Sequence, residues 1–505
     1  CRKLQIGFKM KEIKLFIDGK FTPSSDGKTF NSISSSTGEA IATCHLPSSK
    51  DIDMAVEAAQ KAFYNKDWSE MPQSKRAEIL LTISDKIKER SKELVELEIH
   101  DSGSTLRKAK ADVHNTASFF KVMSKVAASF QFEEQDENAT RAGFSKNFRK
   151  YSPVGVCAQI IPWNFPLVMA GWKIAPILAT GCTAVLKSAM ETPVSAGILA
   201  EILSESGVPA GVINIVTGGA SEGKQLVSHP KVNKIAFTGS TAVGAEILKN
   251  CAATIKNTTM ELGGKSANIV LNDADLDIAV DGALYAFLYH QGQACDSGTR
   301  LLVQEGIYDK FLERFLTRIK DIKAGNPEDK ATGYGPVINE KQFKTIISFI
   351  EKSKQENAKL LSGGNRITGG DFDKGYYIEP TAFEITPDHT IFHEEIFGPV
   401  VGITKFKTED EAISLANNSK YGLAGAVWSK DSTKAKSLAS KIETGTVWIN
   451  EYHLLNPGMP FGGFKQSGLG REMGVEGMKA YLEVQHLWIS DCDGRDQKPW
   501  LDAIF

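Results

Sequence analysis

Hydrophobic residues recur every three or four positions in two stretches near the N-terminus, 51–65 and 74–99, and this spacing predicts amphipathic helices. Between 14 and 30, short apolar runs are interrupted by Asp18-Gly19 and Asp26-Gly27, a pattern typical of β-hairpins. The segment 130–140 is polar and acidic. It fits either a solvated loop or an arm that projects between two halves of one domain.

From residue 151 onward, strand-like and helical patterns alternate along the chain. The pattern predicts strands over 154–161, 183–186, 213–216 and 234–237, and helices over 167–180, 192–205 and 221–228. Such alternation is typical of βαβ units on a parallel sheet, so we expect an α/β fold. A second α/β stretch runs from 267 to about 474, and a β-rich segment over 482–489 follows it. No internal repeat is evident.

Composition and charge narrow the classes of function. The 505 residues include 59 basic and 61 acidic side chains, a net charge of −2, so charge gives no reason to expect a nucleic-acid or membrane partner. The longest apolar stretch, 154–186, is broken by prolines and polar residues, and we predict no membrane span. The seven cysteines include no CxxC pair, so the sequence indicates neither a disulfide framework nor a metal site. Unpaired cysteines are typical of proteins in a reducing compartment, and we expect the cytoplasm. Residues 1–9 lack the apolar core of a signal peptide, and we interpret them as an extension before Met10.

A glycine-containing turn at 237–244 follows a predicted strand and opens a predicted helix. Glycine lets the backbone approach a phosphate, and a helix N-terminus offers free N–H donors. The segment is neither a Walker A loop nor a GxGxxG fingerprint. Taken alone, it fits an ordinary tight turn as well as a phosphate site.

Three single residues carry chemistry of their own. Cys295 lies in a polar, glycine-flanked turn after a helix, where it is either a buried apolar side chain or an accessible nucleophile. Glu261 ends an apolar strand before two glycines and is either a base or a surface carboxylate. Asn164 follows a strand between aromatic residues and prolines, where its amide either caps a turn or stabilises an oxyanion.

The order and composition of these segments resemble the NAD(P)-dependent aldehyde dehydrogenase superfamily from about residue 14 to 489. The segments 394–400, 445–450 and 460–468 add to the resemblance. It implies that Cys295 attacks the aldehyde carbonyl and that the Asn164 side chain and the Cys295 N–H stabilise the oxyanion. Glu261 would help to deprotonate the thiol and then activate water to hydrolyse the thioester. The implied products are a carboxylate and NAD(P)H.

The resemblance also implies a cofactor site, for NAD with NADP also possible. Its expected members are Ile160, Pro162, Trp163, Lys187, Gly218, Phe237, Gly239, Ser240, Leu262, Glu395 and Phe397. Among them, Lys187 would hold the adenosine ribose, Ser240 would face the pyrophosphate, and Glu395 with Phe397 would surround the nicotinamide ribose. The other expected members of the active site are a proton-exit pair, Lys173 and Glu472, and three aldehyde-tunnel aromatics, Phe165, Trp172 and Phe461. Ordinary core aromatics remain the alternative for the last three.

The sequence departs from the family pattern at three positions. Met190 stands where NAD-preferring relatives carry an acid for the ribose 2′-hydroxyl, which implies NAD preference with relaxed discrimination against NADP. His290 replaces the usual Asn before the thiol turn, and Asp296 directly follows the nucleophile, where a carboxylate that approached the thiol would raise its pKa. With Glu451 and Tyr452 at the expected tunnel mouth, an acidic entrance would suit a cationic aldehyde. The aromatic at 461 argues against one, and we favour a broad aliphatic, aromatic or retinal-type aldehyde.

The family architecture implies a Rossmann-type cofactor domain from 10–129 and 154–261 and a catalytic domain from 262–476. An oligomerisation arm from 130–153, with residues 477–505, would pair chains as a homodimer or homotetramer. Apolar residues in the tail predict that it docks. Two alternatives are a CoA-acylating aldehyde dehydrogenase, which Glu261 disfavours, and a catalytically silent binding or structural relative. The presence of Cys295, Glu261 and Asn164 disfavours the latter.

Overall fold

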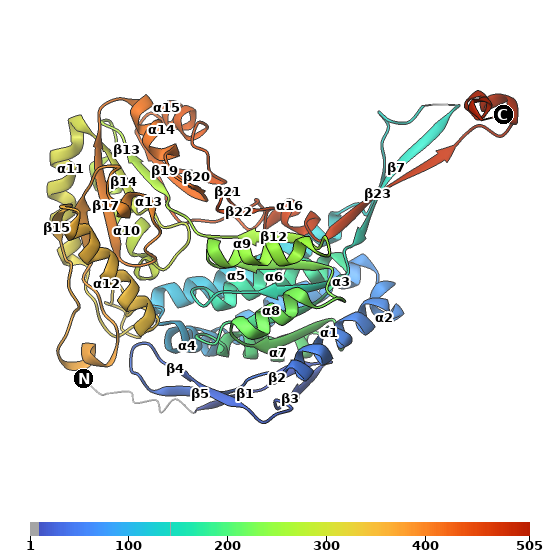
Figure 1. Ribbon diagram of the computed structural model, residues 1–505, viewed down its shortest axis with the longest axis horizontal. Helices are drawn as coiled ribbons and strands as arrows, with labels where there is room; N and C mark the ends of the chain where they lie inside the picture. The colour runs from blue at the N-terminus through green and yellow to red at the C-terminus, as the bar shows by residue number, and fades with distance from the viewer. Residues whose placement is uncertain (1–9, 142, 505) are drawn as a thin grey trace.

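A computed structural model describes residues 10–141 and 143–504 (Figure 1). The proposed extension before Met10 lies outside these residues. Two large sheets, each covered by helices, stand side by side, and a narrow β-arm projects from one of them (Figure 1). Within the described ranges, no helix is long and apolar enough to cross a bilayer.

The first sheet has eight strands with a parallel centre. In spatial order they are β22 (Gly468–Leu469), β12 (Asn257–Glu261), β11 (Lys234–Thr238), β8 (Val156–Ile160), β9 (Thr183–Ser188), β10 (Ile213–Thr217), β2 (Leu15–Ile17) and β3 (Lys20–Thr22). The five strands from β12 to β10 are parallel, and the outer strands are antiparallel. The carboxyl ends of these five strands therefore meet at one edge, where open α/β sheets bind ligands.

Helices cover both faces of this sheet (Figure 1). They are α1 (Ser49–Tyr64), α2 (Lys66–Ser69), α3 (Gln73–Glu89), α4 (Ser91–Ser102), α5 (Leu106–Ser129), α6 (Pro166–Thr180), α7 (Val194–Glu205), α8 (Ala220–Ser228) and α9 (Thr241–Ala252). α6 is buried along its whole length, as its continuous apolar sequence requires, and it packs between the sheet and α5. This central helix carries two of the expected site residues.

The second sheet has seven strands. In spatial order they are β15 (Lys359–Ser362), β16 (Thr381–Glu384), β17 (Val400–Phe406), β14 (Arg300–Gln304), β13 (Ala267–Val270), β19 (Ala424–Trp428) and β20 (Thr446–Ile449). All neighbours are parallel except β15 with β16. The helices of this region are α10 (Leu276–Leu288), α11 (Glu305–Arg318), α12 (Glu340–Gln355), α13 (Thr390–His393), α14 (Glu409–Asn417), α15 (Ser432–Ala439) and α16 (Gly474–Lys479). α16 packs against α5 and α6 and so joins this part of the chain to the first unit.

The arm is a three-stranded sheet in the order β23 (Leu482–Ser490), β7 (Ser145–Pro153) and β6 (Glu133–Gln135). β23 and β7 pair along nine residues, so the segment 130–140 belongs to an arm and not to a simple loop. At its end, the ring of Trp500 packs edge-on against Phe144 with centroids 5.2 Å apart. The tail therefore docks on the arm, as its apolar residues predict.

Some local predictions were wrong. The stretch 74–99 is two helices, because the backbone leaves helical geometry at Arg90, which has φ −91° and ψ 15°. Asp26-Gly27 is a turn but not a hairpin, because β3 belongs to the eight-stranded sheet whereas β4 (Thr29–Ile33) pairs with β5 (Ala40–His45). β5 also pairs with β1 (Lys11–Ile13), and β18 (Tyr421–Gly422) pairs with β21 (Phe464–Lys465). The sequence analysis did not predict α5.

Candidate active site

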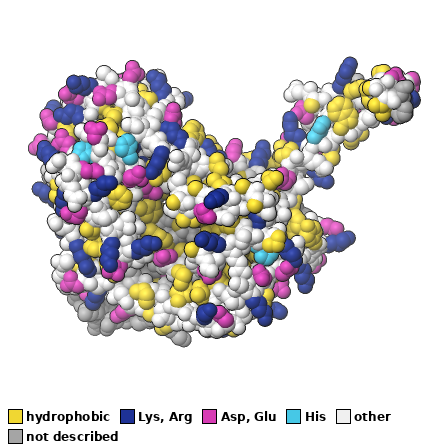
Figure 2. All heavy atoms as spheres, in the orientation of Figure 1, with side chains coloured by type: hydrophobic (Ala, Val, Ile, Leu, Met, Phe, Trp, Pro, Cys, Tyr) yellow, Lys and Arg dark blue, Asp and Glu magenta, His cyan; other side chains and the backbone are white. Residues whose placement is uncertain are grey.

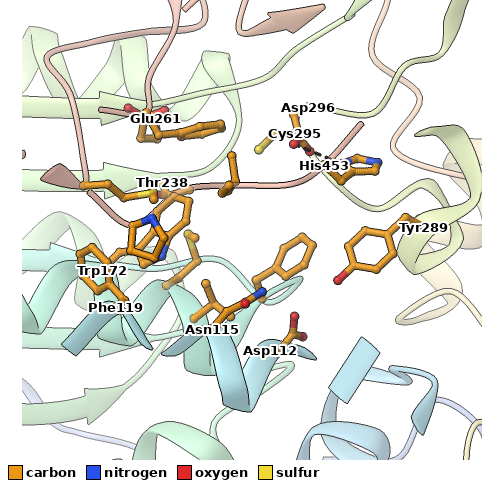
Figure 3. A pocket seen from close by; sticks show the side chains of 17 residues that line it. Asp112, Asn115, Phe119, Trp172, Thr238, Glu261, Tyr289, Cys295, Asp296 and His453 are labelled. Atoms are coloured by element: carbon orange, nitrogen blue, oxygen red, sulfur yellow. Dashed lines mark hydrogen bonds and ion pairs between the residues drawn. The ribbon is translucent and has the colours of Figure 1, made fainter. Parts of the chain in front are cut away.

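A cavity of about 100 Å³ lies where α5, α6 and the ends of β11 and β12 meet the thiol turn (Figure 3). Its lining is Asp112, Asn115, Phe119, Phe165, Val168, Met169, Trp172, Thr238, Glu261, Tyr289, Cys295, Asp296, His453, Leu455, Pro457, Phe461 and Met473. The expected nucleophile, the expected base and all three expected tunnel aromatics are therefore brought to one hollow. Its walls are mainly apolar and aromatic.

The turn that carries Cys295 is built from unusual backbone conformations. After α10 ends, His290, Gln291 and Gly292 have positive φ values of 51°, 57° and 73°. A Cβ atom at Gly292 would lie 2.1 Å from the Gly398 carbonyl oxygen, so only glycine fits. Backbone strain of this kind persists where the surrounding structure enforces it. Here the three positive-φ residues reverse the direction of the chain, and Cys295 then points into the cavity.

The Cys295 thiol is surrounded by apolar groups and acids. Burial raises its pKa well above the ordinary value, and the charges of Asp296, Glu395 and Glu261 raise it further. The other described cysteines are buried and free, whereas Cys295 is partly exposed. Cys295 is thus the accessible thiol among the described residues, and it is protonated at neutral pH.

Glu261 ends β12 and is only 4% exposed. In the described ranges, neither oxygen of its carboxyl group has a hydrogen-bond partner. Burial raises its pKa to about 8, and the charges of Lys173 and Arg471 only partly offset this. A carboxyl group with this pKa accepts a proton from a thiol or water more readily than an ordinary glutamate does.

Asn164 is buried after β8 and does not itself line the cavity, but its side chain contacts the thiol turn. Its Nδ2 donates to the Gln293 carbonyl oxygen at 2.8 Å, and the second N–H of the amide has no partner among the residues that the structure describes. Lys108 holds the backbone here, with Nζ 3.4 Å from the Asn164 carbonyl oxygen and 4.1 Å from the centre of the Phe165 ring. The amide is therefore fixed against the thiol turn, two residues before Cys295.

His290 is buried under this loop. Burial and the positive charge of Lys108 hold its pKa well below the ordinary value, so the ring is neutral. Its ring packs against Phe165 in a tilted arrangement, with an interplanar angle of 57° and a centroid distance of 5.4 Å. His290, the residue that departs from the family pattern, therefore lies behind the site and packs against the loop that carries Asn164.

The expected cofactor residues gather at the carboxyl ends of the five parallel strands. Ile160, Pro162 and Trp163 end or follow β8, Lys187 is on β9, Gly218 follows β10, Phe237, Gly239 and Ser240 lie at β11 and the start of α9, and Leu262 follows β12. The Lys187 ammonium donates to the Gly218 carbonyl, and burial lowers its pKa to about 8. The Ser240 side chain caps α9, whose first N–H groups face this edge.

Glu395 and Phe397 approach this edge from the second unit. Glu395 accepts a hydrogen bond from the Gly264 N–H at 3.0 Å, and burial raises its pKa to about 7. Phe397 has a φ of 57° and packs edge-on against Trp163 at 5.4 Å. The Thr238 hydroxyl is buried and has no hydrogen-bond partner within the described part of the chain, and Thr238 also lines the cavity. A helix N-terminus, a lysine and an unpaired hydroxyl at one edge fit a dinucleotide.

The expected proton-exit pair is a buried ion pair behind the cavity. Lys173 on α6 and Glu472 are in direct contact, with side chains 0% and 3% exposed. Burial lowers the pKa of Lys173 to about 7, and the charge of Glu261 acts in the opposite direction. Their chain neighbours Trp172 and Met473 line the cavity, so the pair lies directly behind its wall.

The two aspartates that line the cavity have cationic or basic partners, whereas Glu261 has none among the described residues. Asp112 contacts Lys108, and Asp296 contacts His453. Of the two residues expected near the tunnel mouth, Tyr452 is 0% exposed and Glu451 is exposed, and neither lines the cavity. In the described ranges, no group of three potential metal ligands was found.

The sequence analysis missed the wall that α5 provides. Asp112, Asn115 and Phe119 lie on one face of this helix at spacings of three and four residues. That spacing was the available signal, since it matches the period of a helix. It does not, however, distinguish a cavity wall from an ordinary core face.

Comparisons with known proteins decide the family. The model of the aldehyde dehydrogenase family matches residues 21–487. The chain belongs to this family. It is 42% identical to the mitochondrial aldehyde dehydrogenase of Homo sapiens, over 94% of this chain and 91% of that protein. The predicted resemblance, the α/β fold and the enzyme class are thereby confirmed.

Solved aldehyde dehydrogenases have the same fold. The NAD+ complex of the enzyme from Bacillus cereus matches with a TM-score of 0.91 and 40% identity, covering 95% of this chain and 96% of that one. Betaine aldehyde dehydrogenase from Staphylococcus aureus, also in complex with NAD+, matches with a TM-score of 0.92 and 40% identity over 95% of each chain.

Proposed function

We propose that this aldehyde dehydrogenase converts a neutral, apolar or aromatic aldehyde to a carboxylate with NAD(P)+ and water, using Cys295 as the nucleophile. The observation that carries the proposal is the single cavity lined by both Cys295 and Glu261. A thiolate adds readily to an aldehyde carbonyl, and the thiohemiacetal on Cys295 becomes a thioester once its hydride has passed to the acceptor. Hydrolysis of that thioester, which releases the carboxylate, needs an activated water. A thiol and a buried carboxyl group in one hollow meet both needs.

Asn164 is the proposed electrophilic group. When the Cys295 thiolate adds to the carbonyl carbon, negative charge develops on the substrate oxygen. The second N–H of Asn164 and the backbone N–H of Cys295 would stabilise that charge. Removal of one such donor from an oxyanion site typically lowers turnover about 10²–10³-fold.

Nicotinamide dinucleotide, when bound, supplies the hydride acceptor. Lys187 and Ser240 would hold its adenosine and phosphate parts, and Glu395 with Phe397 would hold its other ribose. Met190 lies against Gly219, next to the contact between Lys187 and Gly218. Because a neutral thioether neither binds a 2′-hydroxyl nor repels a 2′-phosphate, we propose NAD preference with measurable use of NADP.

Glu261 is the proposed base for deacylation. Its carboxylate form, favoured as the pH rises past about 8, would take a proton from water that attacks the thioester carbonyl. The proton then has to leave a buried site. The Lys173–Glu472 pair lies behind the cavity wall, and the charge of Lys173 acts on Glu261. Both observations support the pair as the route by which the proton leaves.

The charges of the cavity support a neutral substrate. Asp112 and Asp296 are each paired, so neither offers a free carboxylate to a cationic aldehyde. Aromatic rings of Phe119, Trp172 and Phe461 form much of the remaining wall. We therefore expect benzaldehyde or a longer aliphatic aldehyde to be oxidised faster than betaine aldehyde.

The test is the absorbance of reduced nicotinamide with a panel of aldehydes, NAD or NADP, and no CoA. Oxidation without CoA supports hydrolysis of the thioester, and the relative kcat/KM values give the substrate and cofactor preferences. Cys295→Ala should abolish turnover, whereas Glu261→Gln should accumulate an acyl group on Cys295 that mass spectrometry detects. Normal turnover by Glu261→Gln, or oxidation only with CoA, would refute the hydrolytic mechanism.

We further propose a homodimer or homotetramer, assembled through the arm, in the reducing cytoplasm. The arm and its tail expose apolar side chains at Val484, Trp488, Ile489, Trp500 and Ile504, and yellow side chains mark this part of Figure 2. Such a patch is better covered by a second copy than left in water. A reducing compartment would keep the nucleophilic thiol reduced. Light scattering that gave the mass of a single chain would contradict the assembly.

A further inference from the structure

A buried pair of side chains, Asp296 and His453, lies beside the thiol and has no part in the proposed mechanism. Oδ2 of Asp296 is 3.2 Å from Nδ1 of His453, and the two side chains are 11% and 3% exposed. On the other side of the ring, Nε2 of His453 is 3.0 Å from the carbonyl oxygen of Ala286. Figure 3 shows the pair next to Cys295, with a dashed line joining its members.

Both partners of the His453 ring are acceptors, and this fixes the number of protons in the pair. A neutral imidazole has one N–H and a carboxylate has none, so together they would leave one of the two contacts without a proton. One more proton is needed, on either the imidazole or the carboxyl group. In both arrangements the charges of the two side chains sum to zero. With a proton in each of the two contacts, the pair carries no net charge although it contains an acid.

Aromatic rings hold the pair in place. The His453 ring lies 5.4 Å from Tyr285, 5.1 Å from Tyr289 and 4.8 Å from Tyr452, measured between centroids. The Tyr452 hydroxyl also donates to the backbone carbonyl of Asp296 at 2.9 Å. These contacts fix both ends of the pair and shield it from water.

Other titratable groups face the pair and the thiol from the surrounding elements. They are Asp112 on α5, Tyr285 on α10, Tyr289, Tyr452 and Glu451 around the ring, and Glu261 and Glu395 around the thiol. These groups are acids or phenols. The cations near them include Lys108, which contacts Asp112, Lys173, whose charge acts on Glu261, and Arg300, whose charge acts on Tyr452. Without His453, the carboxylate of Asp296 would add one more negative charge directly beside the thiol, and like charges disfavour ionisation.

The inference rests on the proposed role of Cys295 as the nucleophile. We propose that His453 is a positioning residue that pairs with Asp296 and offsets the charge of this carboxylate, so that Cys295 ionises more readily than it would beside an unpaired acid. A chain with an acid at position 296 consequently depends on a basic partner at 453. The two positions, far apart in the sequence, act as one unit that sets the nucleophilicity of the thiol.

The test measures the pH dependence of alkylation of Cys295 by iodoacetamide, a reaction in which the thiolate displaces iodide. Peptide mass spectrometry follows Cys295 alone, with the buried Cys44 as an unreactive reference. The full-length wild type is compared with His453→Leu, Asp296→Asn and the double variant. His453→Leu should move the midpoint to higher pH by about one unit, a tenfold slower reaction on the acid side. The double variant should return to the wild-type profile.

Two results would overturn the inference. If His453→Leu kept the wild-type profile, the pair would not control the thiol. If the double variant stayed as slow as His453→Leu, the effect would come from lost packing and not from charge. If His453→Leu does not fold, Asp296→Asn is the deciding variant. It removes the acid next to the thiol, so the midpoint of Cys295 alkylation must stay unchanged or move to lower pH. A higher midpoint would refute the proposal.

The same readout separates this inference from the proposed function. Alkylation needs no aldehyde and no turnover. If the wild type oxidised no aldehyde but the variants moved the alkylation midpoint as expected, the proposed function would fail and the charge coupling would stand. If turnover were normal and the alkylation midpoints did not move, the proposed function would stand and the charge coupling would fail.

Discussion

Glu261→Gln should stabilise the fold while it removes the proposed base. The pKa of Glu261 is about 8 in the folded chain against an ordinary value of 4.5. The unfolded chain therefore releases this proton from pH 4.5 upward, and the folded chain keeps it until about pH 8. Between these values the group costs the wild type stability at about 1.4 kcal/mol per pH unit, and the cost levels off near 5 kcal/mol. Gln does not ionise and has no such cost.

The expected change in melting temperature follows from the size of the chain. At about 2.1 cal/mol/K per residue, unfolding 505 residues has an entropy of roughly 1.1 kcal/mol/K. The cost of about 3.4 kcal/mol at pH 7 then corresponds to a variant that melts about 3 °C higher than the wild type. The difference should be about 2 °C at pH 6 and about 4 °C at pH 8.5.

The assay is thermal unfolding of both proteins at one scan rate across pH 6 to 8.5. Glu89→Gln, on the exposed surface of α3, is the matched control and should show no growth of the difference with pH. A difference that stayed constant with pH, or a variant less stable than the wild type at pH 8.5, would refute the assignment of Glu261 as a buried, unpaired carboxyl group.

Two further predictions concern the frame of the site. Lys173→Met should lower the melting temperature by about 3–5 °C, because the Glu472 carboxylate is left buried without its partner at a cost of roughly 3–5 kcal/mol. Lys173→Met combined with Glu472→Leu should recover most of this, and no recovery would show that the loss is one of packing. Gly292→Ala should abolish alkylation of the thiol and destabilise the fold, since its φ is 73° and a backbone carbonyl occupies the Cβ position. Gly27→Ala is the control, with a φ of 74° and open space, and it should cost only about 1 kcal/mol; equal effects at both glycines would contradict the argument.

Much of the fold follows from local pattern. The parallel strands β8 to β11 were predicted within a few residues, because buried strands alternating with helices leave a clear signal in the sequence. α5 was not predicted, although it forms one wall of the cavity. Whether a face of this helix lines a cavity depends on which elements pack against it, and the local sequence pattern does not determine that packing.

The candidate site divides in the same way. Cys295, Glu261 and Asn164 could be named because each stands in a distinctive local segment. The partner of Asp296 could not, because His453 is 157 residues further along the chain and only the folded backbone brings them together. The charge of the cavity therefore could not be judged from the acids alone, since the partner of Asp296 comes from a distant part of the chain.

The tight backbone packing around the thiol turn has a consequence for how such an enzyme changes over time. A Cβ atom at Gly264 would lie 2.2 Å from the Cys295 carbonyl oxygen, and the turn at Gly292 is equally close to its neighbour. The position of the nucleophile is therefore set by contacts between backbone segments and not by the identity of the surrounding side chains. The walls of the cavity can diverge toward new aldehydes residue by residue while the reacting atom keeps its place, so substrate range can evolve without rebuilding the chemistry.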